Sequence, residues 1–269
     1  MKPTHTPQPR VRQPAVAGLF YPDSPQELSA QVETFLAKVS AEGEPTPKAI
    51  VAPHAGYVYS GPIAASVYQR LRANDAQFER VVLLGPSHRV PFRGLACGSW
   101  DAFRSPLGQV PVDREVLRPL LASGLVTELD DAHLREHSLE VHLPFLQQVL
   151  GEFKLVPLVV GDATPEQVGR VLEQLWSGPE TLIVVSSDLS HYHPYAEARM
   201  LDAATSRAIE ALDYQALGWD DACGRVPLSG LLWLAARRGL HARTVDLRNS
   251  GDTAGDRAQV VGYGAYVVE

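Results

Sequence analysis

Short apolar runs that alternate with helical patterns constrain the fold of this chain more than any other feature. Four of these runs have the length and composition of strands buried on both faces, and they cover residues 49–53, 80–85, 155–160 and 181–186. Segments with helix-start signals lie between them, such as Thr164-Pro165-Glu166-Gln167, which has the pattern of a capping box. This alternation predicts an α/β fold, a three-layer α/β/α sandwich around a central, mostly parallel or mixed sheet.

Similar signals predict the remaining elements. Helices are expected over residues 25–38, from Pro62 onward, over 114–122 and 138–150, with two or three more between 195 and 238, and strands over 94–100, 243–247 and 259–268. Residues 1–12 are rich in proline and offer almost nothing that a core could bury, which predicts a flexible N-terminal arm. Residues 13–269 contain neither a low-complexity linker nor an internal repeat, so a single domain is expected there.

Composition and charge narrow the classes of function. The chain has 269 residues, of which 45% are hydrophobic, so it can bury a large core without a disulfide or a structural metal. A formal charge of −7 and the lack of any Lys/Arg run argue against nucleic acid or an anionic membrane as partner. No apolar stretch approaches the roughly 18 residues of a membrane span. Two cysteines, Cys97 and Cys223, are too few for a disulfide framework and suit a cytoplasmic protein.

Three of the four central runs lead directly into residues that bind metals or exchange protons. His54 follows the first run, His88 follows the second, and Asp188 follows the fourth, with His191 and His193 just beyond it. Because ligands bind outside the carboxyl ends of strands in open α/β sheets, these side chains are expected to converge on one crevice. The sequence therefore predicts a functional site at this edge of the sheet.

Two further segments carry candidate residues. The run from Glu136 to His142 is dense in acids and histidines; Glu140 and His142 are interpreted as groups that support or contact a substrate, and Glu136 and His137 as a solvated helix face. Cys223 lies just before an expected helix and near Arg225, which would favour its thiolate for metal binding or nucleophilic chemistry; a small core residue is the alternative. For Cys97, the core interpretation is preferred. HExxH, GxSxG, P-loop and GxGxxG patterns are all lacking.

Seven ordered motifs together resemble one known family. They are PHAGYVYSGP, LLGPSH, AFRSPLG, EHSLEVHLPFL, SSDLSHY, CGRVPLSGLL and VGYGAY. Over roughly residues 13–269 the chain resembles the Memo family, also called AmmeMemoRadiSam system protein B, which is itself similar to the LigB-type class III extradiol dioxygenases. The resemblance implies a LigB-like three-layer α/β/α domain with a metal pocket at one edge of the sheet.

The resemblance also implies roles for particular residues. His54, His88 and Cys223 match the positions of metal ligands, while Asp188 and His191 match positions that line the same pocket. Tyr57, in the PHAGY motif, is expected with Glu140 and His142 in the substrate pocket. Non-haem Fe(II) oxygenases use two histidines and one carboxylate, whereas the third ligand here is a thiolate, which argues against direct transfer of ring-cleaving activity.

Three functions are compatible with these residues. The first is an oxidoreductase that uses Fe(II) or copper, with His191 as acid or base and Asp188 orienting it. The second is an accessory protein without turnover that binds metal, a small molecule or a peptide; the resemblance implies AMMECR1-like and radical SAM proteins as partners. The third is a hydrolase in which zinc activates water. The substrate, the physiological metal and the oligomeric state are not predicted.

Overall fold

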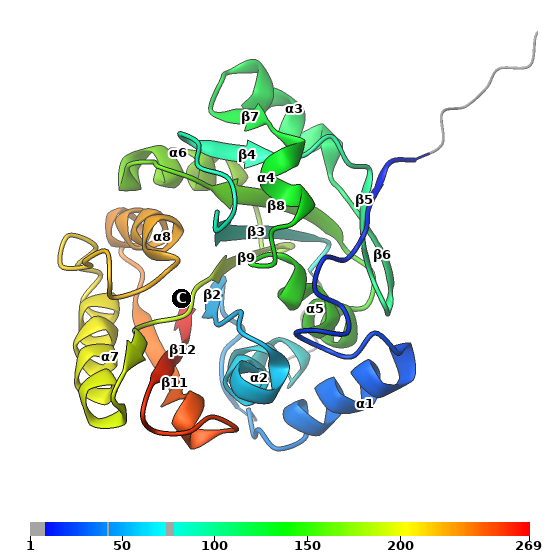
Figure 1. Cartoon of the computed structure of the whole chain (residues 1–269). Coiled ribbons are helices and arrows are strands. Elements are labelled where there is room, and N and C mark those ends of the chain that lie inside the picture. Colours follow the sequence, from blue (N-terminus) through cyan, green and yellow to red (C-terminus); the bar gives the residue numbers. More distant parts are fainter. Residues whose placement is uncertain (1–8, 42, 74–77) are drawn as a thin grey trace, which may run out of the picture.

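The structure is a computed structural model that describes residues 9–41, 43–73 and 78–269. Its centre is a mixed sheet that comprises nine strands within these ranges, in the order β10-β12-β2-β9-β3-β8-β4-β7, with β11 beside β12 (Figure 1). The strands are β2 (Ala49–Ala52), β3 (Arg80–Pro86), β4 (Leu95–Cys97), β7 (Val126–Glu128), β8 (Lys154–Val160), β9 (Thr181–Ser186), β10 (His191–His193), β11 (Ala242–Asn249) and β12 (Val260–Val268).

The middle of this sheet is parallel and its margins are mixed. Neighbours β2, β9, β3 and β8 run parallel, whereas β12 is antiparallel to β2 and β4 is antiparallel to β8. The four parallel strands are the four apolar runs of the sequence, and almost every residue in them is buried. Their carboxyl ends therefore meet at one edge of the sheet.

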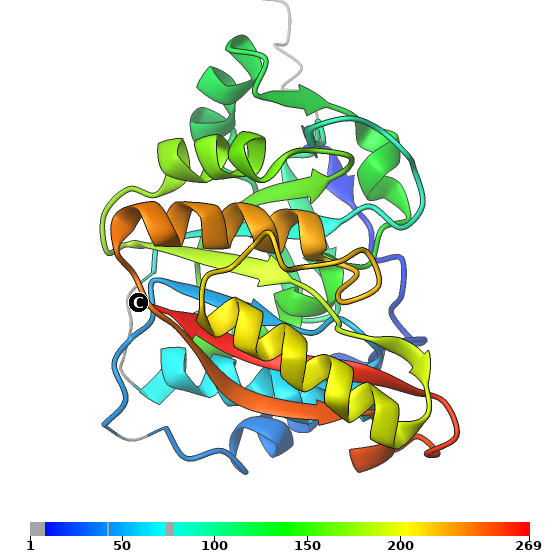
Figure 2. The same ribbon diagram turned by 90° about the vertical axis from the view of Figure 1, so that its left-hand side faces the viewer.

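Helices cover both faces of the sheet, which confirms the α/β fold with flanking helical layers. On one face lie α6 (Pro165–Leu175), α7 (Tyr195–Glu210) and α8 (Arg225–Arg238), as Figure 2 shows. The opposite face carries α2 (Tyr57–Ala73) and α5 (Leu143–Leu150), with α1 (Pro25–Leu36) packed outside them (Figure 1). The smaller elements are α3 (Arg114–Ala122), α4 (Asp130–Leu134) and the short 3-10 helices η1 (Glu140–His142) and η2 (Ser250–Asp252).

Helix starts agree with the sequence signals at most positions. The capping box of α6 is present, since the Thr164 side chain accepts from the backbone of Gln167 and the Gln167 side chain accepts from the backbone of Thr164. Helix α2 begins at Tyr57, so the expected start at Pro62 is wrong. The backbone bond from Ser60 to Gly56 already closes the first turn, and a proline so close to the start removes only one further helical bond.

The N-terminal segment is held more firmly than its composition indicates. Strand β1 (Val11–Arg12) pairs with β5 (Ala102–Ser105), which pairs with β6 (Gly108–Pro111) in a separate small sheet. Arg12 is buried and forms an ion pair with Glu140. The flexible arm expected over residues 1–12 is therefore wrong for Arg12, because a distant carboxylate neutralises its charge. Residues 1–8 lie outside the described ranges.

Two further expectations concern the burial of Cys97 and the presence of a membrane-spanning helix. Cys97 lies in β4 and is fully buried, which confirms its interpretation as a core residue. Among the described residues, no helix has the length and apolarity needed to cross a bilayer.

Candidate metal centre

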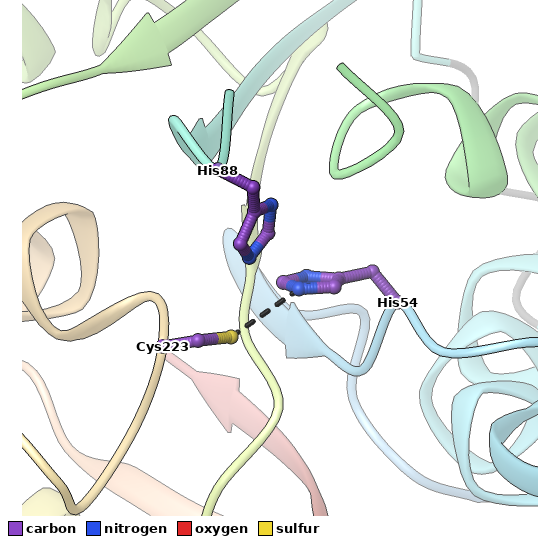
Figure 3. A group of neighbouring side chains, drawn as sticks. All are labelled: His54, His88 and Cys223. Carbon is purple, nitrogen blue, oxygen red and sulfur yellow. Dashed lines mark hydrogen bonds between the residues drawn. The ribbon is translucent and has the colours of Figure 1, made fainter. Parts of the chain in front are cut away.

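Two strand ends and one loop bring the predicted ligands together. His54 follows β2, His88 follows β3, and Cys223 lies in the loop that precedes α8 (Figure 3). Their ligand atoms all lie within 4.8 Å of one another, and Cys223 Sγ is 3.2 Å from His54 Nε2. The two imidazole rings meet edge to face, with centroids 5.1 Å apart. Two nitrogens and one sulfur at this spacing could hold a single metal ion.

Two glycines permit the close backbone approaches that this arrangement requires. A Cβ atom at Gly224 would lie 2.4 Å from the carbonyl oxygen of Ser186, so a larger residue would push the Cys223 loop away from β9. A Cβ at Gly85 would lie 2.7 Å from Ser138 Oγ and would separate β3 from the segment that supports His88. The ligand positions therefore depend on these two glycines, which have no side chain, as well as on the ligand residues themselves.

Glu136 orients His88. Its Oε1 lies 2.8 Å from His88 Nδ1, and its Oε2 accepts from the His88 backbone amide at 2.6 Å. Burial alone would raise the pKa of Glu136, but hydrogen bonds from His88 and from the Ser138 amide lower it to about 2. With Nδ1 engaged by a carboxylate, the Nε2 atom of His88 is left for a metal. The solvated position expected for Glu136 is wrong, since the residue is 2% exposed.

His137 also lies in the site rather than on a solvated face. Its ring stacks on His88 with a centroid separation of 4.7 Å and an interplanar angle of 18°. Burial lowers its pKa to about 4, so the ring is neutral at pH 7. His137 therefore places a neutral imidazole beside the two ligand histidines.

The ring of His54 is held by a neutral hydroxyl and its backbone by a carboxylate. Its Nδ1 atom lies 2.6 Å from Ser186 Oγ, and its backbone amide donates to Asp188 Oδ1 at 2.7 Å. Burial, followed by the neighbouring histidines, lowers its pKa well below the usual value. His142 lies behind Ser186, with its Nε2 atom 2.8 Å from Ser186 Oγ, so it supports the site from the core and does not line the cavity.

The thiol of Cys223 is protonated in the metal-free protein. Burial, followed by the charge of Asp188, raises its pKa above the usual value. The thiolate expected from the nearby helix start is therefore not favoured without a metal, because desolvation outweighs the helix dipole. A metal would have to displace this proton, which couples binding to pH.

Asp188 and His191 line a cavity of about 860 Å³ in front of the cluster. The His191 Nδ1 atom donates to the Leu189 carbonyl at 2.7 Å, which leaves Nε2 available to a ligand. Burial raises the pKa of Asp188 to about 6, although the His54 amide and the charge of His191 oppose this effect. Aromatic and basic residues complete much of the wall: Phe20, Tyr59, Arg89, Tyr192 and Tyr263.

Glu140 and Tyr57 are not among the residues that line this cavity. Glu140 is fully buried and accepts from Arg12, from the Ala15 and Val16 amides, and from the Tyr21 hydroxyl. The Tyr57 hydroxyl donates to the Val141 carbonyl at 2.6 Å. Both residues anchor the wall of the site, because they hold the N-terminal segment and α2 against η1.

Sequence reasoning did not identify Glu136, His137 and Ser186 as parts of the site. Ser186 is the last residue of β9, two positions before Asp188, and its place at a strand end was the available signal. Helical spacing across the dense run that includes Glu136 and His137 predicts a solvated helix face for both residues. Residues 136–139 form no helix, so helical spacing does not describe them.

Comparisons with known proteins agree with the motifs. A family model described as Memo-like protein matches residues 12–267. A MEMO1 family protein of Aquifex aeolicus is 41% identical, with 94% of this chain and 97% of that protein covered. One from Aeropyrum pernix is 38% identical, with 95% and 99% covered. The crystal structure of uncharacterized protein JW3007 from Escherichia coli K12 covers 81% of this chain and 98% of that one with a TM-score of 0.51 at 14% identity, which shows similarity of fold alone.

Proposed function

Because the chain belongs to the Memo family, we propose that it is a metal-dependent oxidoreductase in which His54, His88 and Cys223 hold Fe(II) or copper. The observation that carries this proposal is the cluster of three ligand atoms within 4.8 Å of one another, in which His54 and His88 line an 860 Å³ cavity and Cys223 lines a smaller neighbouring one. A site that only stabilised the fold would be closed by its ligands, whereas this one faces a cavity.

The donor set fits a redox metal. Imidazole suits iron, copper and zinc, and thiolate favours the softer of these ions. When bound, iron or copper would supply one-electron chemistry that side chains cannot perform. The thiolate replaces the carboxylate of the LigB-type dioxygenases, so the proposal extends to redox chemistry and not to ring cleavage.

The surrounding residues supply the proton chemistry of the proposal. His191 presents a free Nε2 atom to the cavity and would act as acid or base. Asp188 accepts from the His54 amide and links its own backbone to Cys223, because the Asp188 amide donates to Cys223 Sγ at 3.3 Å. These two hydrogen bonds fix His54 and Cys223 relative to each other, while the largely buried Asp188 side chain still lines the cavity.

One surface feature favours the alternative of an accessory protein. Exposed apolar side chains gather at the openings around the cluster: Tyr59 and Tyr192 line the main cavity, and Trp219, 72% exposed, lines a smaller one with Cys223. Exposed aromatic groups of this kind are common where another protein docks. AMMECR1-like and radical SAM proteins are the proposed partners in this case.

The proposal is tested by elemental analysis after anaerobic purification. Wild type, His88→Ala and Cys223→Ser are compared, with His193→Ala as control because this nearby histidine pairs with Glu197. We expect near-stoichiometric iron or copper in wild type and the control, and loss in both ligand variants with unchanged circular dichroism. Stable zinc would instead support a hydrolase. A protein that takes up no metal after reconstitution would overturn the proposal in favour of the accessory protein.

A further inference from the structure

A chain of buried side chains lies behind the metal centre and has no part in the chemistry proposed above. It runs from Tyr68 in α2 through His142 and Ser186 to His54. The Tyr68 hydroxyl lies 2.8 Å from His142 Nδ1, His142 Nε2 lies 2.8 Å from Ser186 Oγ, and Ser186 Oγ lies 2.6 Å from His54 Nδ1. Each of these side chains is almost fully buried. Water therefore does not provide alternative partners for them.

A second contact of Ser186 fixes the direction of these hydrogen bonds. Ser186 Oγ donates to the Ser138 carbonyl oxygen at 2.6 Å, and a carbonyl oxygen can only accept. The single hydroxyl proton is thereby used, so Ser186 must accept from both imidazole rings. His54 then carries its proton on Nδ1, and its Nε2 lone pair points towards Cys223. His142 carries its proton on Nε2, which leaves Nδ1 to accept from Tyr68.

In the neutral form that a metal can bind, each ring carries one proton and has one tautomer to adopt. A metal binds only the deprotonated nitrogen of a neutral imidazole. The position of the His54 proton therefore decides whether Nε2 is ready for a metal.

The same hydroxyl connects the two histidine ligands. The Ser138 amide donates to Glu136 Oε1 at 2.9 Å, and this oxygen lies 2.8 Å from His88 Nδ1. The path from His54 to His88 thus passes through Ser186, the Ser138 backbone and Glu136. A displacement of Ser186 would be transmitted to both ligands.

We propose that Ser186 is a positioning residue that keeps the proton of His54 on Nδ1, so that Nε2 is free for a metal. The proposal rests on the metal site proposed above. It adds that the affinity of this site is set partly by a hydroxyl that does not touch the metal, an effect that typically amounts to 10- to 100-fold for groups behind a ligand histidine.

The first test needs no metal. Ring ¹⁵N chemical shifts of the metal-free protein report which nitrogen of His54 is protonated, with His54→Gln used for assignment. We expect the Nδ1–H tautomer in wild type and a mixture of tautomers in Ser186→Ala. A wild-type His54 with its proton on Nε2 would overturn the proposal, and this result does not depend on whether Ser186→Ala folds.

The second test measures binding of Co²⁺, whose absorption bands report thiolate and imidazole ligands. We expect Ser186→Ala to bind Co²⁺ 10- to 100-fold more weakly and Ser186→Thr, which restores the hydroxyl, to recover most of the loss. Ser229→Ala is the matched control, because Ser229 is also buried and its hydroxyl has no hydrogen-bond partner in the described part of the chain. Equal affinity of Ser186→Ala and wild type would overturn the proposal. If wild type itself bound no Co²⁺, the proposed metal site would fail, and the tautomer of metal-free His54 would still decide the present inference.

Discussion

The two histidines of the proposed metal centre lie in contrasting surroundings. His54 is 2% exposed and is backed by a serine hydroxyl, a second histidine and a tyrosine, all neutral. The side chain of His88 is 29% exposed and is backed by the ionised carboxylate of Glu136. One ligand is therefore positioned by the packed core and the other by a charge, although both present Nε2 to the same point.

The carboxylates beside the two histidines also differ, in the direction in which their pKa is shifted. On the His88 side, hydrogen bonds oppose the effect of burial and lower the pKa of Glu136 to about 2. On the His54 side, burial dominates and raises the pKa of Asp188 to about 6. Glu136 receives more donors than Asp188, which compensates for its desolvation. The contrast teaches that donor count, and not burial alone, decides which acid stays ionised.

Removal of the charge behind His88 is expected to have the largest effect. Glu136→Gln keeps the shape of the side chain but loses the carboxylate, so we expect Co²⁺ affinity to fall by about 100-fold. Glu197→Gln is the control, because this exposed carboxylate also pairs with a histidine, at 3.1 Å from His193 Nδ1, but has no contact with His88. Isothermal titration calorimetry of the two variants measures the difference. Unchanged affinity of Glu136→Gln would mean that His88 needs no charged support.

The pH dependence of stability sharpens the contrast between the two acids. The pKa of Asp188 is near 4 in the unfolded chain and is raised to about 6 in the folded protein. Ionisation of Asp188 therefore destabilises the fold as pH rises through this interval, and the full effect is roughly 3 kcal/mol. Glu136 has a lowered pKa, so its stabilisation is present above about pH 4.5 and is lost as pH falls towards 2.

Urea unfolding of metal-free Asp188→Asn between pH 4 and pH 7 isolates the first effect. The difference in unfolding free energy between variant and wild type should change by roughly 2 kcal/mol in favour of the variant over this range, because part of the effect is already present at pH 4. A difference that stays constant with pH would show that Asp188 ionises with its ordinary pKa.

The smallest expected effect is the coupling between Ser186, which supports His54, and Glu136, which supports His88. A double-mutant cycle with Ser186→Ala and Glu136→Gln measures whether the path through the Ser138 backbone joins them. We expect a coupling free energy of about 1 kcal/mol in Co²⁺ binding. Additive losses would show that the core and the charge hold their histidines independently.

Much of the fold could be predicted because its signals are local. Strand β9 occupies the residues expected from its apolar run, and α6 carries the capping box read from its first residues. The convergence of His54 and His88 could be predicted from strand ends, and that of Cys223 with them from the family resemblance. The burial of Arg12 could not be predicted, because its ion pair joins residues 128 positions apart and leaves no pattern in the local sequence.

The supporting residues were harder to identify for a physical reason. Helical spacing places side chains on a face only where a helix exists, and residues 136–139 instead form a loop that turns Glu136 and His137 inward. Ser186 belongs to a run that is buried throughout, so its apolar neighbours concealed its role. Side chains that act through other side chains carry no spacing rule of their own.

The distance along the chain between the ligands has a consequence for biosynthesis. His54 and Cys223 are 169 residues apart, and the loop that carries Cys223 is made only after most of the sheet. At ordinary elongation rates this interval takes roughly 10–30 s. During that time the nascent chain has the two histidines without their thiol partner, so a metal at the proposed site would be acquired by an almost finished polypeptide and not by a growing one.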